Sequence, residues 1–409
     1  MYRHNQLKAG RASPTDSQDA DFVSILHIII DLDIGGAELM LKRLVESHQG
    51  NPDYRHSVIS LRQMGRVGEQ LQESGIDVHA MDMRSMLDFP RVFWQLVKLI
   101  RKTRPNVIQT WMYHADLIGG LAARFAGNHS VIWGVRGSAI PQGRMSSTQM
   151  VVYLCSWLSR YIPQVIVCCA ESARVAHAEK GYDPSKMIVI PNGYKLSHFI
   201  RNTIRRRQIR DEFGISYDDI VVGIVGRFDP LKDYKNFVYA ANQVASKVEK
   251  VKFLMIGRNI DSSNTHLKQW LNESAFAHKF VLAGERTDVP DCLSAMDIFC
   301  LSSSKEGFPN VVCEAMAMSV PCVVTSAGDA AEIVADTGIV VAPKDSIALS
   351  VALQTMIGLG TDERLRLGRL ARLRVERNYS IEIASARFED IYSRLFHGLP
   401  LAPSANREK

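Results

Sequence analysis

Two glutamates stand eight positions apart around a Gly-Phe-Pro-Asn turn in residues 304–315, which read Ser-Lys-Glu-Gly-Phe-Pro-Asn-Val-Val-Cys-Glu-Ala. Residues 297–301 predict a buried strand and residues 311–318 an apolar helix, so Glu306 lies in the loop and Glu314 on the helix. The backbone N–H groups at a helix start have no internal acceptors and can point at a ligand. The segment could therefore grip a hydroxyl-rich ligand from two sides. A helix-capping Glu306 and a solvated Glu314 are the structural alternative.

Two cations stand in a turn earlier in the same half of the chain. Arg227 and Lys232 follow the predicted strand at residues 220–225 and are five positions apart, which does not place them on one helix face. Both could converge on one anionic group, and fixed cations stabilise a leaving group that gains negative charge as its bond breaks. The alternative is two solvated cations on a loop.

A pair of glycines, Gly35 and Gly36, follows the first predicted strand and opens an apolar helix. Glycines allow a phosphate or leaving oxygen to approach backbone N–H groups at the positive end of a helix. The spacing is not Gly-x-Gly-x-x-Gly, which argues against a nicotinamide-dependent oxidoreductase. A plain strand-to-helix turn would look the same.

These motifs together resemble the retaining glycosyltransferases of family 4, which have the two-domain GT-B fold. The resemblance implies that Arg227 and Lys232 bind the donor diphosphate without a metal ion, and that Glu314 holds the ribose of the nucleotide. It also implies that Gly35 and Gly36 face the donor phosphates and the acceptor. The donor sugar would be held by the carboxylate and loop of Glu306, Gly307, Phe308, Pro309, Asn310 and Val311. Arg227, Lys232 and Glu306 would then be catalytic, and no cofactor is expected.

The remaining site residues are carried by weaker matches to the same family. Arg286 and Thr287 stand in a loop that resembles the one that reads the nucleotide base. On the acceptor side, the family's His-x-His positions are occupied here by Gln109 and Trp111. His114, three residues on, is the catalytic or sugar-contacting candidate.

Two further candidates and one departure concern the first half of the chain. Trp111 could stack on an acceptor sugar, and Arg136 could grip an anionic acceptor. Lys195 stands where the family often has Asp.

Short apolar or β-branched runs alternate with helical patterns along the chain, which predicts parallel sheets flanked by helices in two doubly wound α/β domains. These runs are at residues 24–31, 57–61, 107–110, 131–134, 165–169, 187–190, 220–225, 252–256, 279–282, 297–301 and 321–325. With the resemblance, we expect a disordered tail (1–21), an acceptor-side domain (22–195), a nucleotide-sugar-binding domain (196–375), a helix crossing back onto the first domain (376–396) and a second tail (397–409). Ligands of such sheets bind at the carboxyl ends of the strands, so the site should be the cleft between the domains.

Composition limits the remaining choices. A chain of 409 residues exceeds one hydrophobic core, and no apolar run approaches the ~18–20 residues that span a bilayer. Seven cysteines without paired spacing suggest buried residues in a reducing, intracellular compartment. Residues 91–104 hold five basic residues and no acid, which fits either an ordinary surface helix or a helix that lies on anionic lipid. No motif for nucleic-acid binding accompanies this charge.

The sequence therefore predicts a cytoplasmic, metal-independent, retaining hexosyltransferase, peripheral to the inner face of the membrane. Its donor would be a nucleotide diphosphate sugar, with a UDP-sugar favoured over GDP-mannose. Its acceptor would be a saccharide, lipid-linked in surface polysaccharide or glycoconjugate synthesis. A GT-B sugar-nucleotide epimerase and a non-catalytic nucleotide-sugar-binding protein are the alternatives. Donor sugar, base, acceptor, linkage and oligomeric state are left open.

Overall fold

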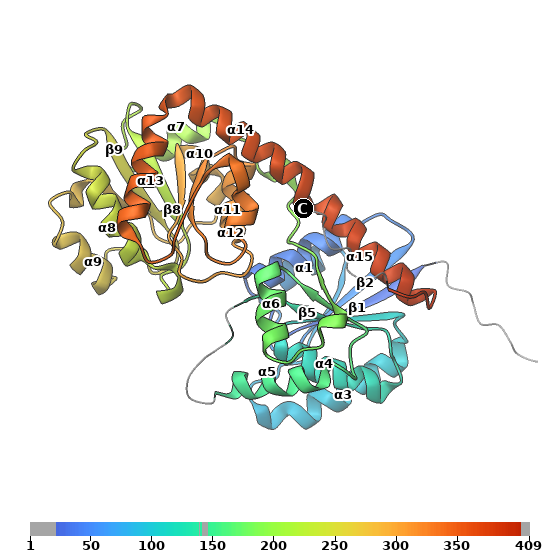
Figure 1. The fold of residues 1–409 in the computed structure, drawn as a ribbon. Coiled ribbons are helices and arrows are strands. Elements are labelled where there is room, and N and C mark those ends of the chain that lie inside the picture. Colours follow the sequence, from blue (N-terminus) through green and yellow to red (C-terminus); the bar gives the residue numbers. More distant parts are fainter. Residues whose placement is uncertain (1–21, 139, 141–145, 402–409) are drawn as a thin grey trace, which may run out of the picture.

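Two parallel β-sheets, one of seven strands and one of six, form the centres of two α/β domains (Figure 1). The computed structural model describes residues 22–138, 140 and 146–401. The predicted tail at residues 1–21 and most of the tail predicted at residues 397–409 lie outside these ranges.

The first domain alternates strands and helices from β1 to β7. Its central strand, β1, is buried along nearly its whole length, as expected for a strand covered on both faces. The strands are β1 (Val23–Ile29), β2 (Tyr54–Ser60), β3 (Asp77–Ala80), β4 (Val107–Trp111), β5 (Val131–Val135), β6 (Val165–Cys168) and β7 (Met187–Val189). The helices are α1 (Gly36–Ser47), α2 (Gly65–Glu73), α3 (Phe89–Thr103), α4 (Tyr113–Ala126), α5 (Ser147–Leu158) and α6 (Glu171–Glu179).

The second domain repeats this alternation. Its strands are β8 (Ile220–Val225), β9 (Val251–Ile256), β10 (Phe280–Leu282), β11 (Ile298–Leu301), β12 (Cys322–Thr325) and β13 (Ile339–Val341). Its helices are α7 (Thr203–Glu212), α8 (Tyr234–Ala245), α9 (Thr265–Asn272), α10 (Val289–Ala295), α11 (Asn310–Ala317), α12 (Ala330–Val334), α13 (Ser346–Gly358) and α14 (Gly360–Asn378), and α15 (Ile381–Phe396) ends the chain's secondary structure.

In both sheets, the order in which the chain adds strands reverses next to the first strand. The strand orders are β3-β2-β1-β4-β5-β6-β7 and β10-β9-β8-β11-β12-β13, so the reversals lie between β1 and β4 and between β8 and β11. Crevices at such points are the usual ligand sites of open α/β sheets. Gly36 and His114 lie in the first turns of the helices after β1 and β4, and Arg227 and Glu306 lie in the loops after β8 and β11.

The prediction of two doubly wound domains is confirmed, and two strands that it missed are β3 and β13. Both are short strands at the edge of a sheet, with only one neighbour each. β3 alternates polar and apolar residues over only four positions, and β13 is apolar but only three residues long, so neither gives the longer run by which a central strand is predicted.

The last two helices connect the domains. Helix α14 packs on α11 of the second domain, whereas α15 packs on α1, β1 and β4 of the first. The chain crosses between domains at two places that lie side by side, since Tyr194 N–H donates to Tyr379 O and Ile381 N–H donates to Tyr194 O. The predicted helix that crosses back is therefore confirmed.

A buried chain of three histidines fixes α15 to the first sheet. Trp111 Nε1 donates to His27 Nδ1 at 3.2 Å, His27 Nε2 lies 2.8 Å from His56 Nδ1, and His56 Nε2 lies 2.7 Å from His48 Nδ1. His48 Nε2 then lies 3.0 Å from the carboxylate of Glu389 on α15. Because the Trp111 N–H can only donate, each histidine in turn carries its proton on Nε2. Burial lowers the pKa of His27 to about 3, so this imidazole is neutral at neutral pH.

All seven cysteines are free and buried, as predicted. Within the described residues, no helix combines the length and apolar composition needed to cross a membrane.

Candidate active site

Glu306 and Lys232 form an ion pair at the carboxyl ends of β11 and β8. Glu306 Oε1 accepts hydrogen bonds from Lys232 Nζ at 2.7 Å and from Ser303 Oγ at 2.6 Å. The two side chains are only 13% and 22% exposed. Lys232 ends a short 3-10 turn, Pro230–Lys232, whose start is capped by the carboxylate of Asp229. The two motifs predicted to hold the donor therefore meet, although 74 residues separate them.

Arg227 lies at the outer side of the same turn. Its side chain is 62% exposed, and Nε donates to Asp229 Oδ2 at 3.1 Å. Burial raises the pKa of Asp229, but the Leu231 amide and the Arg227 guanidinium outweigh it and hold this pKa below its ordinary value. An anion that approaches the turn thus meets one accessible cation, Arg227, and one cation already paired with a carboxylate.

Glu314 faces the first domain. Its Oε1 lies 3.7 Å from Arg43 Nη2 on α1, and the Arg43 guanidinium also stacks on the Tyr194 ring, 4.6 Å from the centroid. Burial raises the pKa of Glu314, while the charges of Arg43 and Lys232 oppose that shift. The sequence did not single out Arg43, because a basic residue on an amphipathic helix carries no motif of its own.

Asn310 is the centre of a second set of contacts between the domains. Its Oδ1 accepts from Asn192 Nδ2 at 2.7 Å and from Tyr194 OH at 2.5 Å. A Cβ at Gly36 would lie 2.8 Å from Asn310 Nδ2, so the first-domain glycine faces the second-domain loop. Gly36 thus allows a close approach of this amide, and the predicted approach of a phosphate stays a prediction.

The backbone of the Glu306 loop is held by side chains of the first domain. Ser138 Oγ donates to the carbonyl of Glu306, and a Cβ at Gly307 would lie only 3.0 Å from the Ser138 amide nitrogen. Asp329 of the second domain accepts from the amides of Glu171 and Ser172 at 2.7 and 2.9 Å and so caps α6 of the first. These contacts hold the loop against the first domain without using the Glu306 carboxylate.

The glycine pair before α1 is covered by its own helix. The carboxylate of Glu38 accepts from the amides of Glu38 and Ala37, at the place where a phosphate was expected. A Cβ at Gly35 would lie 3.1 Å from Cδ of that carboxyl group. Burial raises the pKa of Glu38 despite these amides, so the group can hold a proton more readily than an ordinary glutamate.

Among the acceptor-side residues, the prediction that Trp111 stacks on an acceptor sugar is wrong. Its ring is fully buried and contacts His27 and Phe388, so it cannot stack on an acceptor sugar. Its strand position explains this, because β4 is a central strand and Trp111 points into the core. Arg136 lies above the Trp111 ring, with its guanidinium 5.2 Å from the centroid.

Arg136 and His114 lie at the strand ends where they were predicted. Arg136 donates to Asn192 Oδ1, its Nε is enclosed without a hydrogen-bond partner, and burial lowers its pKa. His114 is half-buried in the first turn of α4, and burial lowers its pKa, which favours the neutral imidazole. Their contact with an acceptor stays a prediction.

Arg286 forms ion pairs with two carboxylates. Its guanidinium donates to both oxygens of Asp288 at 2.8 and 2.7 Å and to Glu212 Oε1 at 2.5 Å. These contacts tie α7 to the loop before α10, and the contact of Arg286 with the donor stays a prediction. Thr287 is exposed beside it, and its donor contact stays a prediction.

Phe308 and Pro309 are also buried, with the Phe308 ring 5.6 Å from that of Tyr379. Their side chains shape the loop rather than face a ligand. Val311 is half-buried at the start of α11, and its contact with the donor stays a prediction.

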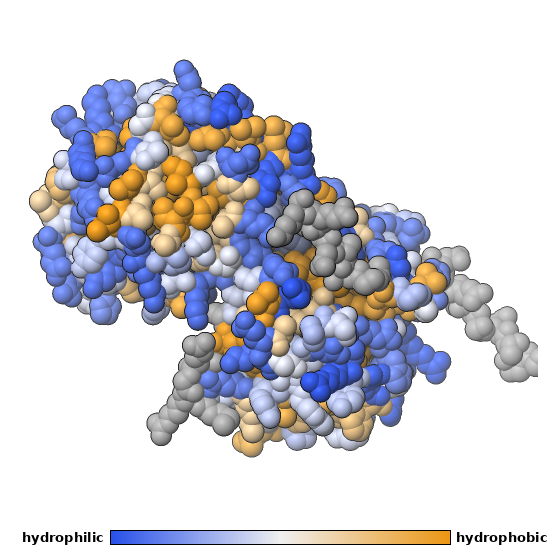
Figure 2. All heavy atoms as spheres, in the orientation of Figure 1, coloured by the Kyte–Doolittle hydropathy of each residue, from blue (hydrophilic) through white to orange (hydrophobic). Residues whose placement is uncertain are grey.

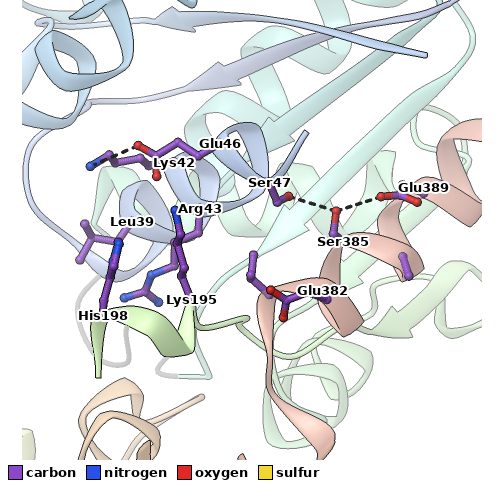
Figure 3. A pocket seen from close by; sticks show the side chains of 12 residues that line it. Leu39, Lys42, Arg43, Glu46, Ser47, Lys195, His198, Glu382, Ser385 and Glu389 are labelled. Carbon is purple, nitrogen blue, oxygen red and sulfur yellow. Dashed lines mark hydrogen bonds and ion pairs between the residues drawn. The ribbon is translucent and has the colours of Figure 1, made fainter. Parts of the chain in front are cut away.

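A pocket of about 560 Å³ opens on the opposite side of Arg43, between α1, α15 and the turn Leu196–His198 (Figure 3). Lys42 and Glu46 pair on one wall, and Ser47, Ser385 and Glu389 are linked on another. Lys195, the residue that departs from the resembling family, lines this pocket and not the cleft at Glu306.

Comparison with known families and proteins gives consistent matches. Residues 34–198 match the family described as Glycosyltransferase Family 4, and residues 219–358 match that described as Glycosyl transferases group 1. A UDP-Gal:alpha-D-GlcNAc-diphosphoundecaprenol alpha-1,3-galactosyltransferase from Escherichia coli is 27% identical over 249 residues. That match covers 60% of this chain and 62% of the relative, less than two thirds of its length.

Two further comparisons cover more of the chain. The capsular polysaccharide biosynthesis glycosyltransferase CapM of Staphylococcus aureus is 24% identical over 327 residues, 76% of this chain and 81% of the relative. The Anabaena protein HepE, solved in complex with UDP, is 19% identical, with a TM-score of 0.79 over 91% of this chain and 100% of that one. The structural similarity confirms the two-domain, Rossmann-like GT-B fold.

Proposed function

Because the chain belongs to the family 4, group 1 glycosyltransferases, we propose that it transfers a hexose or N-acetylhexosamine from a nucleotide diphosphate sugar to a saccharide acceptor. The observation that carries this proposal is the Lys232–Glu306 pair at the reversal of the second sheet, in a loop bonded to Ser138 of the first domain. Sugar and diphosphate are adjacent in such a donor. The ammonium of Lys232 suits the diphosphate, and the carboxylate of Glu306 suits the hydroxyls of the sugar.

In the proposed reaction, the bond between the sugar and the diphosphate breaks and the acceptor hydroxyl takes its place. The leaving diphosphate gains negative charge, which Lys232 and Arg227 stabilise. When Lys232 turns to the phosphate, the Glu306 carboxylate is freed to accept hydrogen bonds from sugar hydroxyls. Glu314 holds the ribose, with Arg43 keeping its carboxylate ionised.

We further propose that transfer retains the anomeric configuration and needs no metal ion. In this mechanism the acceptor attacks from the face that the diphosphate leaves, and the leaving phosphate accepts the acceptor proton. His114, in its neutral form, would contact the transferred sugar, and Arg136 would hold an anionic group of the acceptor.

A UDP-sugar is the proposed donor, with GDP-mannose as the alternative, and a lipid-linked saccharide is the proposed acceptor. The support comes from the relatives: the E. coli protein is named for a UDP-Gal donor and a diphosphoundecaprenol-linked acceptor, and HepE was solved with UDP. Such an acceptor would place the protein on the cytoplasmic side, at the inner face of the membrane.

A sugar-nucleotide epimerase would use the same donor site, but it would invert one carbon of the sugar, keep the sugar bound to the nucleotide and need no acceptor saccharide. A non-catalytic binding protein would bind donors and release nothing. Neither has a specific observation in its favour.

A donor panel tests the proposal. Nucleotide diphosphate release is measured from UDP-, GDP- and ADP-sugars, with and without undecaprenyl diphosphate-linked saccharides, and the anomeric proton of the product is read by NMR. We expect acceptor-dependent release that Arg227→Ala and Glu306→Ala lower at least 100-fold. Release that both variants leave unchanged would contradict the site, and an inverted product would contradict retention. A chelator that abolishes transfer would contradict metal independence.

A further inference from the structure

Helix α5 exposes an apolar, aromatic face to solvent. Met150, Tyr153, Trp157 and Tyr161 are all well exposed, with Tyr153 at 74% and Trp157 at 61%. Met150, Tyr153 and Trp157 follow one another at intervals of three or four residues and so lie on one side of the helix, and Tyr161 follows just beyond its end. Val151, Val152 and Cys155 are buried on the other side. Helix α5 is therefore apolar on both sides but packs against the domain with only one of them, so its exposed side has no partner within the described residues.

This face continues onto α4 and α3. The Trp157 and Tyr161 rings are 5.8 Å apart, and Arg124 of α4 donates to the Tyr161 carbonyl. Next to Arg124, the exposed Phe125 ring lies 6.5 Å from the exposed Trp94 ring of α3. The three helices cover the same side of the first sheet, away from α1, α2 and α15 (Figure 1). Apolar residues also gather along the lower edge of this domain in Figure 2.

The charge of this layer has a single sign. Residues 89–170 contain one acid, Asp116, which is fully buried and whose pKa burial raises to about 8. The acids that flank the stretch, Asp88 and Glu171, are each close to an arginine of their own helix. The exposed basic residues of the same stretch, among the residues that the structure describes, are Arg91, Lys98, Arg101, Lys102, Arg104 and Arg160.

We propose that the outer side of α3, α4 and α5 is a membrane-docking surface that lies on an anionic lipid bilayer, with the aromatic face of α5 inserted at the level of the headgroups. Trp and Tyr favour that level, and each basic residue near an anionic surface contributes about 1 kcal/mol. The charge is what selects this occupant, because a second copy of the same basic surface would be repelled.

The docking surface also explains how a lipid-linked acceptor would reach the site, and in this respect it rests on the proposed function. Helix α5 follows the segment that leaves β5 at the cleft, where Ser138 bonds the Glu306 loop. An acceptor whose lipid stays in that bilayer would then be held at the same membrane as the enzyme.

Flotation of the full chain with vesicles, without donor or acceptor, tests the surface. We expect binding to vesicles of equal parts phosphatidylglycerol and phosphatidylcholine, and little binding to phosphatidylcholine alone. Neutralising Lys98 and Lys102 together to Gln should lower the partition coefficient about 25-fold, at about fivefold for each charge. Trp157→Ser with Tyr153→Ser should lower it at least tenfold.

Matched controls lie in the second domain. Tyr217, which is 79% exposed, is changed to Ser, and the exposed Lys250 and Lys268 are changed together to Gln. These variants should float like the unchanged protein, and circular dichroism checks that every variant is folded.

Three results would overturn the docking surface: no binding to anionic vesicles, equal binding to neutral ones, or equal losses in the control variants. A dimer in analytical ultracentrifugation that Trp157→Ser dissociates would assign the face to a second copy instead. Transfer to a water-soluble acceptor analogue is measured separately. Vesicle binding without any transfer would refute the proposed function alone, and transfer without vesicle binding would refute the docking surface alone.

Discussion

A double-mutant cycle can separate the contribution of the Lys232–Glu306 ion pair to stability from its role in catalysis. The variants are Lys232→Met, Glu306→Gln and the two combined, which keep the side-chain volumes nearly constant. At the observed 2.7 Å and an effective dielectric constant of about 20, the Coulomb attraction is about 6 kcal/mol. Desolvation of two mostly buried charges offsets most of it, so we expect a coupling energy of about 2 kcal/mol.

The losses of stability in the two single variants should add up to more than the loss in the double variant, because each single variant leaves one charge without its partner. Lys232→Met leaves the Glu306 carboxylate held only by the Ser303 hydroxyl, at an expected cost of about 2–3 kcal/mol. For a domain of this size, that corresponds to a fall of roughly 5–10 °C in the melting temperature of the second domain. The double variant, which has no unpaired charge, should recover about 2 kcal/mol of the summed loss.

Catalysis should not recover with stability. Scanning calorimetry gives the melting temperatures, and donor-dependent nucleotide release gives kcat/KM for the same four proteins. All three variants should lose at least 100-fold in kcat/KM. Lys232→Met and the double variant lack the ammonium that the diphosphate needs, and Glu306→Gln lacks the carboxylate that holds the donor sugar. The exposed pair of Lys250 and Asp218, 3.5 Å apart, is the matched control and should couple by less than about 0.5 kcal/mol. A coupling as small as this control, or a stable double variant with full activity, would refute the reasoning.

Three other substitutions follow from the geometry. Gly307→Ala should lower kcat/KM at least tenfold, because its Cβ meets the first-domain backbone at 3.0 Å, while Gly358→Ala, which meets nothing within 4 Å, should not; equal kinetics would contradict this. Arg43→Met should raise the pKa of Glu314 further, since burial raises it and Arg43 opposes the shift, so the acidic limb of the donor kcat/KM profile should move to higher pH; an unmoved profile would count against the pair. His27, with a folded pKa of about 3, contributes stability that is complete above its unfolded pKa of about 6.5 and falls by about 2 kcal/mol by pH 5. His27→Gln should flatten the melting temperature between pH 7 and 5, and a parallel slope would exclude this role.

Much of the fold could be predicted because its central strands are buried and rich in apolar and β-branched residues. β1, β4, β8 and β11 are of this kind, and they are also the strands whose ends carry the site. The edge strands β3 and β13 are short and partly exposed, so no periodic signal marks them.

The sequence could predict the contacts of the site that lie within one domain, but not those between the two domains. Glu306 and Lys232 meet because both follow neighbouring central strands, which a sequence pattern can reveal. The partners Arg43 and Asn192 come from the other domain, and their positions depend on how α15 and the two crossing segments join the halves. The ion pair of Arg286 with the distant Glu212 could not be predicted either, because only the packing of α7 brings Glu212 there.

The contacts at the Glu306 loop are of two kinds, and this difference decides what a donor has to do. Ser138 and Asp329 join the domains through backbone groups of the loop and of α6, so a donor can bind without breaking them. The pairs Lys232–Glu306 and Arg43–Glu314 involve the side chains that would hold the donor, so these pairs have to open. Opening a mostly buried pair is unfavourable unless both charges find new partners. A nucleotide diphosphate sugar offers phosphate to the cation and hydroxyls to the carboxylate in one molecule, whereas a free sugar or an inorganic phosphate offers only one of the two. If the chain has the proposed function, the two ion pairs would thereby discriminate against fragments of the donor.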